Sequence, residues 1–157
     1  MAPRAPSRFT IGPDTFRHAP LNAADEFHCV RRVAPVVKNA GLLATALAAK
    51  DGEGEPGERI AGVIEGGAPL FQAFADMTEE DASYVMERCM SATEMLDGEI
   101  WVPTWDPEIK APAIPSLRMI HVLRICYSVL KDAIAVFFSD AVSSLKELGL
   151  LRRTMIP

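Results

Sequence analysis

Residues 116–131, SLRMIHVLRICYSVLK, are apolar on nearly every side when they are placed on a helix. A helix of this kind has to be surrounded by other elements, because water would otherwise cover its apolar sides. The pattern therefore predicts a central helix that begins at Ser116. The side chains expected to face the other helices are Ile120, Leu123, Tyr127 and Leu130. The polar residues form one narrow basic stripe of Arg118, His121, Arg124 or Ser128, and Lys131.

A second helical pattern begins at Ala23, where Asn22 is a suitable N-cap. Its apolar stripe continues on both sides of Pro35. Proline has no N–H, and its ring crowds the carbonyl four residues earlier. We therefore expect a kink or a break between Arg31 and Val36.

Further stretches also have a helical period. Thr78 is followed by three acidic residues, which predicts a capped helix over 78–96 that ends at Gly98. A last helix is expected over 132–148, directly after the central one. Shorter helical segments are expected at 59–64 and 69–75.

Two short hairpins are predicted where strand-forming residues flank turn sequences. Residues 8–11 and 15–18 flank a Gly-Pro-Asp turn, and residues 99–104 and 108–111 flank an Asp-Pro turn. Pro103 confines its strand to an edge, because it cannot donate a ladder hydrogen bond.

Together these patterns predict a mainly α protein, a small helical bundle with one or two short β-hairpins. A chain of 157 residues is most simply one domain, with roughly 68–70% of its unfolded surface buried. The expected organisation is a flexible leader at 1–7, a single helical domain at 8–150 with an acidic loop at 51–59, and a C-terminal tail at 151–157.

Charge and hydropathy narrow the classes of partner. The net charge of −5 and the pI near 5.2 argue against nucleic acid as the main partner. Acid is concentrated between Asp76 and Glu99, where Arg88 is the single base. The longest run without a charged residue, Asn39 to Ala49, is well short of the roughly 20 residues that a membrane helix needs, so no membrane partner is expected.

The sequence contains no recognisable motif of a catalytic, cofactor or metal site. Its pattern lacks CxxC, HExxH, GxSxG and the glycine-rich phosphate loops. His28 and Cys29 are neighbours that point about 100° apart on a helix, so they cannot share a metal ion without further ligands. We therefore expect no enzyme, no cofactor and no metal. Three buried, reduced thiols typical of a cytosolic protein are predicted for Cys29, Cys89 and Cys126.

Two groups of residues are candidates for partner binding. On the predicted helix 78–96, Met90 shares a face with Glu87 and Glu94, and a flexible thioether between acids suits an apolar partner with basic flanks. Trp101 and Trp105, four residues apart on one strand, would share a face and form an aromatic platform. Each group has an alternative interpretation: a solvated helix face, or tryptophans that attach the hairpin to the bundle.

Three segments together resemble the tail assembly chaperones of long-tailed bacteriophages or prophages. EFHCVRRVAPVV at 26–37 is similar to a Phe-His-x-x-Arg-(Arg/Lys)-(Leu/Val)-Ala-Pro segment in one group of these proteins. The second segment is 69–89, which contains MTEED and YV, and the third is WVPTW at 101–105, followed by an apolar helix pair. The resemblance spans roughly 8–140 and departs from the family pattern at Cys29 and in the acidic insert 51–58.

This resemblance implies a non-catalytic protein of the host bacterial cytoplasm that binds the phage tape measure protein, with the tail tube protein as a second candidate partner. It would keep the partner's apolar helices from aggregating and would be absent from the mature virion. Arg31 and Arg32 in the first segment join the expected partner contacts. Other classes left open are a virion connector protein and a small helical adaptor or regulator, and self-association is also open.

Overall fold

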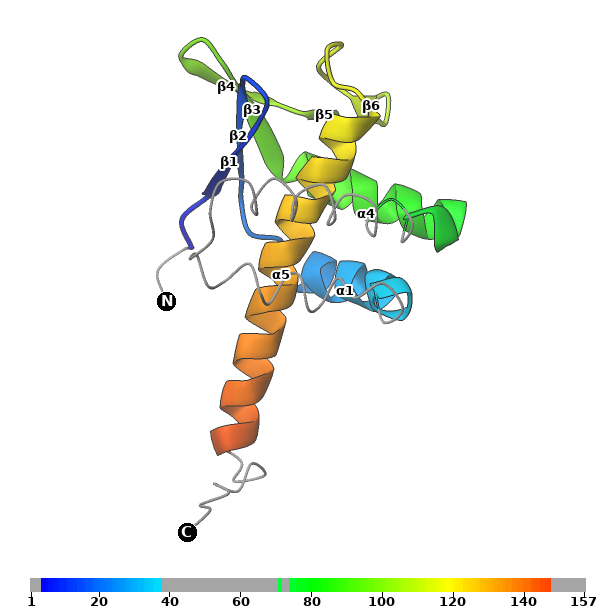
Figure 1. Cartoon of the computed structure of the whole chain (residues 1–157), viewed down its shortest axis with the longest axis vertical. Coiled ribbons are helices and arrows are strands. Elements are labelled where there is room, and N and C mark those ends of the chain that lie inside the picture. The colour runs from blue at the N-terminus through cyan, green and yellow to red at the C-terminus, as the bar shows by residue number, and fades with distance from the viewer. Residues whose placement is uncertain (1–3, 38–70, 72–73, 148–157) are drawn as a thin grey trace.

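Figure 1 shows the computed structural model of the chain, which describes residues 4–37, 71 and 74–147. The helices with described bounds are α1 (Ala23–Val37), α4 (Glu79–Ser91) and α5 (Met119–Glu147). The strands are β1 (Ser7–Ile11), β2 (Asp14–His18), β3 (Thr93–Asp97), β4 (Ile100–Pro103), β5 (Trp105–Asp106) and β6 (Ala111–Pro112). The fold is mixed α/β. The prediction of a mainly α protein is right that helices are present, but it underestimates the β content, because four strands form one sheet.

Strands β1 to β4 form one antiparallel sheet in the order β1-β2-β3-β4. The predicted N-terminal hairpin is confirmed, since β1 and β2 pair with Phe9 opposite Phe16 around Gly12. Strand β2 also pairs with β3, which places Phe16 opposite Met95. Two hairpins that lie far apart in the sequence are therefore joined edge to edge into a single sheet.

The second hairpin differs from the prediction, which paired 99–104 with 108–111. Strand β4 pairs with β3 around Gly98, whose φ of +62° is the left-handed conformation that glycine adopts freely. Strand β5 pairs with β6 instead. The turn at Asp106 is confirmed, because its Oδ1 accepts the N–H of Glu108 at 2.9 Å. Pro103 ends β4, an edge strand of the described sheet, as expected.

Helix α4 begins where the sequence predicts and ends earlier. The N–H of Asp81 donates to Oγ1 of Thr78 at 3.2 Å, which confirms the cap. At the other end, the hydroxyl of Thr93 donates to the carbonyl of Cys89, and that of Thr104 to the carbonyl of Met90, each at 2.8 Å. These hydroxyls satisfy terminal carbonyls of the helix. Residues 93–97 then pair with β2 and β4, so the predicted helix over 92–96 is wrong.

Helix α5 replaces two predicted helices, because Met119–Glu147 is one unbroken element. No glycine or proline falls near residue 132, and charged residues alone do not end a helix. The predicted cap Ser116 is wrong. The N–H of Arg118 donates to Nδ1 of His121 at 3.0 Å, a contact like the return bond of a capping box.

The burial of α5 also differs in part from the prediction. Leu130 is buried, as expected, and Leu123 and Tyr127 are half-buried. Ile120 is 48% exposed, so the prediction that it faces the other helices is wrong. Among the α5 residues whose burial the structure describes, Ile125, Cys126, Val129 and Ala133 are also buried.

Helix α1 begins at its predicted cap, since the N–H of Asp25 donates to Oδ1 of Asn22 at 2.9 Å. The helix then runs through Pro35 to Val37. A break between Arg31 and Val36 is therefore wrong, whereas a kink at Pro35 stays a prediction.

The core formed by the described residues consists of two adjoining clusters. One lies where the three helices meet and contains Val33, Val85, Val129, Leu130 and the three cysteines, all free and buried, as predicted. The other lies between the sheet and α5 and contains Ile11, Phe16, Met90, Trp105 and Ile125. In the view of Figure 1, α5 stands between the sheet and the pair α1 and α4.

Several sequence-based expectations concern residues outside the described ranges. These are the acidic loop 51–59, the helical segment 59–64 and the tail 151–157. The predicted helix 69–75 is helical at 71 and 74–75, its described residues. The boundaries of the leader and of the domain stay predictions.

Candidate functional site

The sheet has one face on the core and one face away from it. Phe9, Ile11, Phe16 and Met95 pack into the core cluster beside α5. Side chains alternate along strands, so their neighbours lie on the opposite face. We call this opposite surface the Arg–Trp face, made of Arg8, Arg17, Glu94, Leu96 and Trp101.

Trp101 is the centre of the Arg–Trp face. The guanidinium carbon of Arg17 lies 4.4 Å from its ring centroid, and that of Arg8 lies 5.5 Å from it. Leu96 is the residue directly opposite Trp101 on β3. Arg17 Nε also donates to Glu94 Oε2 at 2.6 Å. Cation–π contacts at exposed sites contribute about 0.5–1 kcal/mol each. Because this contribution is small, the residues of the Arg–Trp face are positioned chiefly by the pairing of the strands that carry them.

The structure thus brings together two of the predicted partner contacts, Glu94 and Trp101. Sequence reasoning missed the arginines that join them. The alternation in the two N-terminal strands carried the signal, because it places Arg8 and Arg17 together on the face opposite Phe9 and Phe16.

Three other predicted contacts lie elsewhere. Met90 is 0% exposed and Trp105 is 6% exposed, so neither presents a surface to a partner. The helical face that was to unite Glu87 with Met90 and Glu94 does not exist, because Glu94 lies on β3. Trp105 attaches β5 to the core, which was the alternative interpretation of the tryptophan pair. Glu87 is half-buried on α4.

Arg31 and Arg32 differ in their surroundings although they are neighbours on α1. Arg31 is exposed. The Nε of Arg32 lies 2.9 Å from Oδ1 of Asp81, and its guanidinium carbon lies 4.0 Å from the centroid of Tyr84. Arg32 therefore links α1 to α4. These contacts within the chain are an alternative role to the partner contact expected for Arg32.

Tyr84 extends this link between the two helices. Its hydroxyl donates to Oδ1 of Asp25 at 3.3 Å, and Arg88 lies 5.2 Å from its ring centroid. The Nε of Arg88 lies 3.5 Å from the same Asp25 oxygen. Two arginines, two acids and one aromatic ring thus fasten α1 to α4 beside the helical core.

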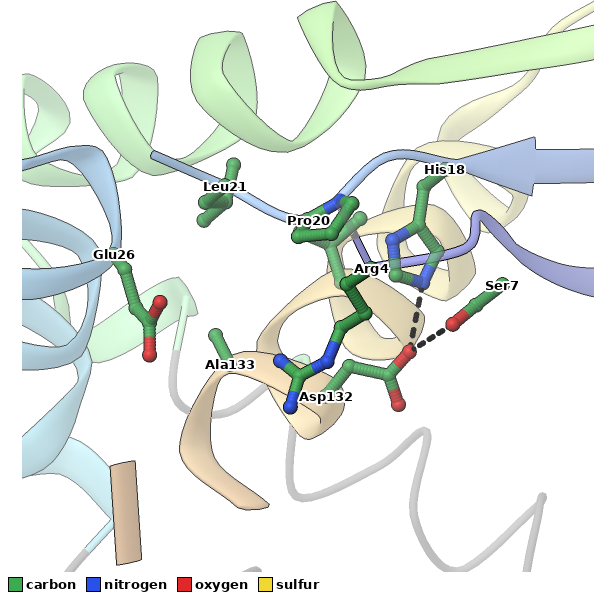
Figure 2. A pocket seen from close by; sticks show the side chains of 9 residues that line it. Arg4, Ser7, His18, Pro20, Leu21, Glu26, Asp132 and Ala133 are labelled. Carbon is green, nitrogen blue, oxygen red and sulfur yellow. Dashed lines mark hydrogen bonds and ion pairs between the residues drawn. The ribbon is translucent and has the colours of Figure 1, made fainter. Parts of the chain in front are cut away.

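A small pocket lies between the N-terminal hairpin and α5 and is lined by residues of both (Figure 2). His18, which is 2% exposed, places Nε2 3.1 Å from Oδ2 of Asp132, and the Ser7 hydroxyl donates to the same oxygen at 2.7 Å. The His18 imidazole is the main cause that lowers the pKa of Asp132 below its ordinary value. Partial burial opposes this effect and the Ser7 hydroxyl reinforces it.

These three residue types also form hydrolytic triads, but the geometry differs. In a triad the serine hydroxyl bonds to one histidine nitrogen and the acid to the other. Here Ser7 and His18 both contact one oxygen of Asp132, and His18 Nδ1 lies 3.2 Å from the carbonyl oxygen of Ala19. The histidine therefore has no nitrogen placed to remove a proton from Ser7, and the cluster ties β1 and β2 to α5.

Within residues 4–37, 71 and 74–147, histidine, cysteine and acidic side chains form no group of three or more arranged to hold a metal ion. None of the helices described there combines the length and the apolarity that crossing a membrane requires.

The described residues define a small mixed α/β protein whose polar clusters connect its elements. The chain belongs to a family of phage tail assembly chaperone proteins, whose model matches residues 12–146. The family is non-catalytic, and it implies partners among the phage tail proteins. Searches of curated protein sequences and of solved structures gave no match.

Proposed function

We propose that this chaperone binds the phage tape measure protein in the cytoplasm of the infected host and keeps it soluble until the tail assembles around it. The chaperone then leaves, so that it is absent from the mature virion. Membership of the tail assembly chaperone family supports a tail protein as the partner. The tail tube protein is the second candidate for that role.

The observation that carries a binding role is the Arg–Trp face. Trp101 and Leu96 form a cross-strand apolar pair on the sheet face away from the core. Tryptophan and arginine are the residue types that most often dominate interface energies. The ring and Leu96 would contact the apolar stripe of a tape measure helix, while Arg8 and Arg17 would orient polar groups beside it. Exposed Arg31 on α1 is a further candidate contact.

The test is co-expression of the chain with the tape measure protein of the same phage or prophage, followed by a pull-down and a measurement of soluble tape measure protein. Trp101→Ala should lose most of the bound partner and of the soluble yield. Met119→Asp is the control, because Met119 is 67% exposed at the start of α5 and is not one of the residues of the Arg–Trp face. The control should bind as the parent does.

Three results would overturn parts of this proposal separately. Failure of the parent chain to retain or solubilise the tape measure protein would refute the partner. Full binding by folded Trp101→Ala, with loss in Met119→Asp, would refute the surface. Detection of the chain by mass spectrometry in purified virions at a fixed copy number would favour a connector protein instead.

A further inference from the structure

The hydrogen-bond pattern of the sheet shows which backbone groups lie at its edges. Along a strand of an antiparallel sheet, successive residues bond alternately to the neighbour on one side and to the neighbour on the other. The N–H of Ala19, the residue after β2, donates to the carbonyl of Ala92 at 2.9 Å. This bond continues the β2–β3 ladder, so the odd-numbered residues of β2 bond to β3 and the even-numbered residues bond to β1.

Strand β1 therefore has backbone groups directed away from the sheet. The residues opposite the even-numbered positions of β2 are Ser7, Phe9 and Ile11, which bond to β2. Between them lie Arg8 and Thr10, whose N–H and C=O groups point to the other side. Arg8 and Thr10 are both exposed, and no strand of the described part of the chain pairs with them there. Their four backbone groups form an open edge.

The opposite edge of the sheet is less suited to pairing. The N–H of Thr104 donates to the carbonyl of Thr93 at 3.1 Å, which continues the β3–β4 ladder. By the same alternation, Trp101 and Pro103 direct their backbone groups away from β3. Pro103 has no N–H, and a proline on an edge strand protects it against pairing with another chain. Strand β1 contains no proline, so its edge is the one that another strand can join.

We propose that the free edge of β1 binds an extended segment of a partner protein, with an acidic side chain opposite Arg8 and an apolar side chain opposite Phe9. Addition of a strand to an open sheet edge is a recurrent mode of peptide recognition, in which main-chain hydrogen bonds provide the affinity. The inference concerns a strand at the edge of the sheet, whereas the proposed function concerns a helix on the Arg–Trp face. The two can therefore fail separately.

Charge indicates the acid in the incoming segment. Arg8 is exposed, and none of the ion pairs between described residues involves it, whereas Arg17 is paired with Glu94. Residues 1–17 carry three arginines and one acidic residue, although the net charge of the whole chain is −5. A carboxylate opposite Arg8 would lie within reach of its guanidinium, because directly opposed side chains on paired strands are neighbours.

The next position along β1 fits an apolar side chain. Phe9 points to the core face of the sheet, where its ring stacks on that of Phe16 with the centroids 5.4 Å apart. Phe16 is 0% exposed, whereas Phe9, which lies at the edge, is half-buried. An apolar side chain opposite Phe9 would cover the part of the ring that its own chain leaves exposed. The incoming strand should therefore alternate between apolar and polar residues.

The experiment uses the full chain and a short synthetic peptide in which valine alternates with threonine and the central threonine is replaced by glutamate. Fluorescence anisotropy measures binding, and NMR measures hydrogen exchange of the backbone amides. The amides of Arg8 and Thr10 should exchange more slowly when the peptide is bound, because they become donors in a new ladder. Absence of binding, or slower exchange at Trp101 in place of these two residues, would overturn the proposal.

Thr10→Pro is the decisive variant, because it removes an outward N–H and leaves the β1–β2 ladder intact. It should weaken peptide binding about tenfold or more, since a backbone hydrogen bond is lost and its acceptor is left unpaired. Thr10→Val keeps the N–H and should bind as the parent does. Circular dichroism checks that both variants fold, and equal binding by the two folded variants would overturn the edge contact. If Thr10→Pro does not fold, hydrogen exchange in the parent decides.

Arg8→Gln tests the charge. It should weaken binding of the glutamate peptide about threefold, as expected for an exposed ion pair, and leave binding of a matched glutamine peptide unchanged. An equal loss for both peptides would refute the acidic position. Sedimentation of the chain alone as a dimer, with the Arg8 and Thr10 amides already protected, would show that a second copy occupies the edge and would overturn the proposal.

Discussion

The guanidinium carbon of Arg17 lies 4.4 Å from the ring centroid of Trp101, while Nε of the same arginine lies 2.6 Å from Oε2 of Glu94. Arg17 belongs to β2, Glu94 to β3 and Trp101 to β4. One side chain therefore spans three strands and fixes the orientation of the tryptophan ring on the Arg–Trp face. That relationship makes Arg17 a positioning residue for the proposed contact.

Arg17→Met should weaken binding of the tape measure protein more than it weakens the fold. Methionine keeps much of the apolar stem and removes the charge, so the loss of unfolding free energy should be about 1 kcal/mol or less, as for exposed ion pairs and cation–π contacts. Denaturant unfolding and an affinity titration measure the two effects. Arg118→Met, which alters an exposed arginine before α5, should leave the affinity unchanged. Equal affinities for the two variants would contradict this role of Arg17.

The two tryptophans should differ sharply in their contribution to stability. Trp105 is 6% exposed in the core, so Trp105→Ala should cost about 3–5 kcal/mol of unfolding free energy. Trp101 lies half-buried on the outer face, and Trp101→Ala should cost considerably less. Chemical denaturation of both variants compares them directly. Similar costs would show that Trp101 is also a core residue.

The sequence could not separate these tryptophans, because the separation depends on a contact distant in the chain. Four-residue spacing predicts one face only if both residues lie on one strand. The chain instead passes from β4 to β5 at Thr104, which is 0% exposed and is anchored to the end of α4. The sequence shows only a threonine between strand-forming residues. The hydrogen-bond partner of the Thr104 hydroxyl is set by tertiary packing, which a local pattern does not show.

Local signals predicted local structure well. The caps at Asn22 and Thr78 and the first hairpin each depend on residues a few positions apart. The candidate site depends on pairing between β2 and β3, and its ion pair joins residues 77 positions apart. Glu94 therefore looked like part of a helix, because the strand that pairs with it lies at the other end of the domain.

Thr104→Val should be costly although it removes no apolar contact. The Thr104 hydroxyl donates to the carbonyl of Met90 at 2.8 Å and lies 3.1 Å from that of Thr93. Valine keeps the shape and leaves a buried carbonyl without its donor, which costs about 1–3 kcal/mol. Thermal unfolding measures the loss, and Thr10→Val, at an exposed position of β1, is the control. Equal midpoints for the two variants would contradict the capping role of Thr104.

Asp132→Asn should change how stability depends on pH. The pKa of Asp132 is lowered in the folded chain, so its carboxylate contributes stability above the ordinary Asp value of 3.8. That contribution is lost as the pH falls through the lowered folded pKa. The parent should therefore exceed Asp132→Asn in unfolding free energy at neutral pH, and the difference should vanish in acid. Asp97→Asn, at the exposed end of β3, is the control. A difference that persists unchanged in acid would exclude ionisation of Asp132 as its cause.

Met90→Asp should destabilise the fold severely, whereas a surface Met90 would have tolerated the charge. Met90 is 0% exposed and packs with Phe16 and Ile125. An unpaired carboxylate placed there must be protonated or hydrated, and the cost of burying it is several kcal/mol. Ser83→Asp, at an exposed position of the same helix, should change the unfolding free energy by about 0.5 kcal/mol or less. Circular dichroism and denaturant titration compare the two variants. If folded Met90→Asp matched Ser83→Asp in stability, the cluster between the sheet and α5 would have to be packed differently.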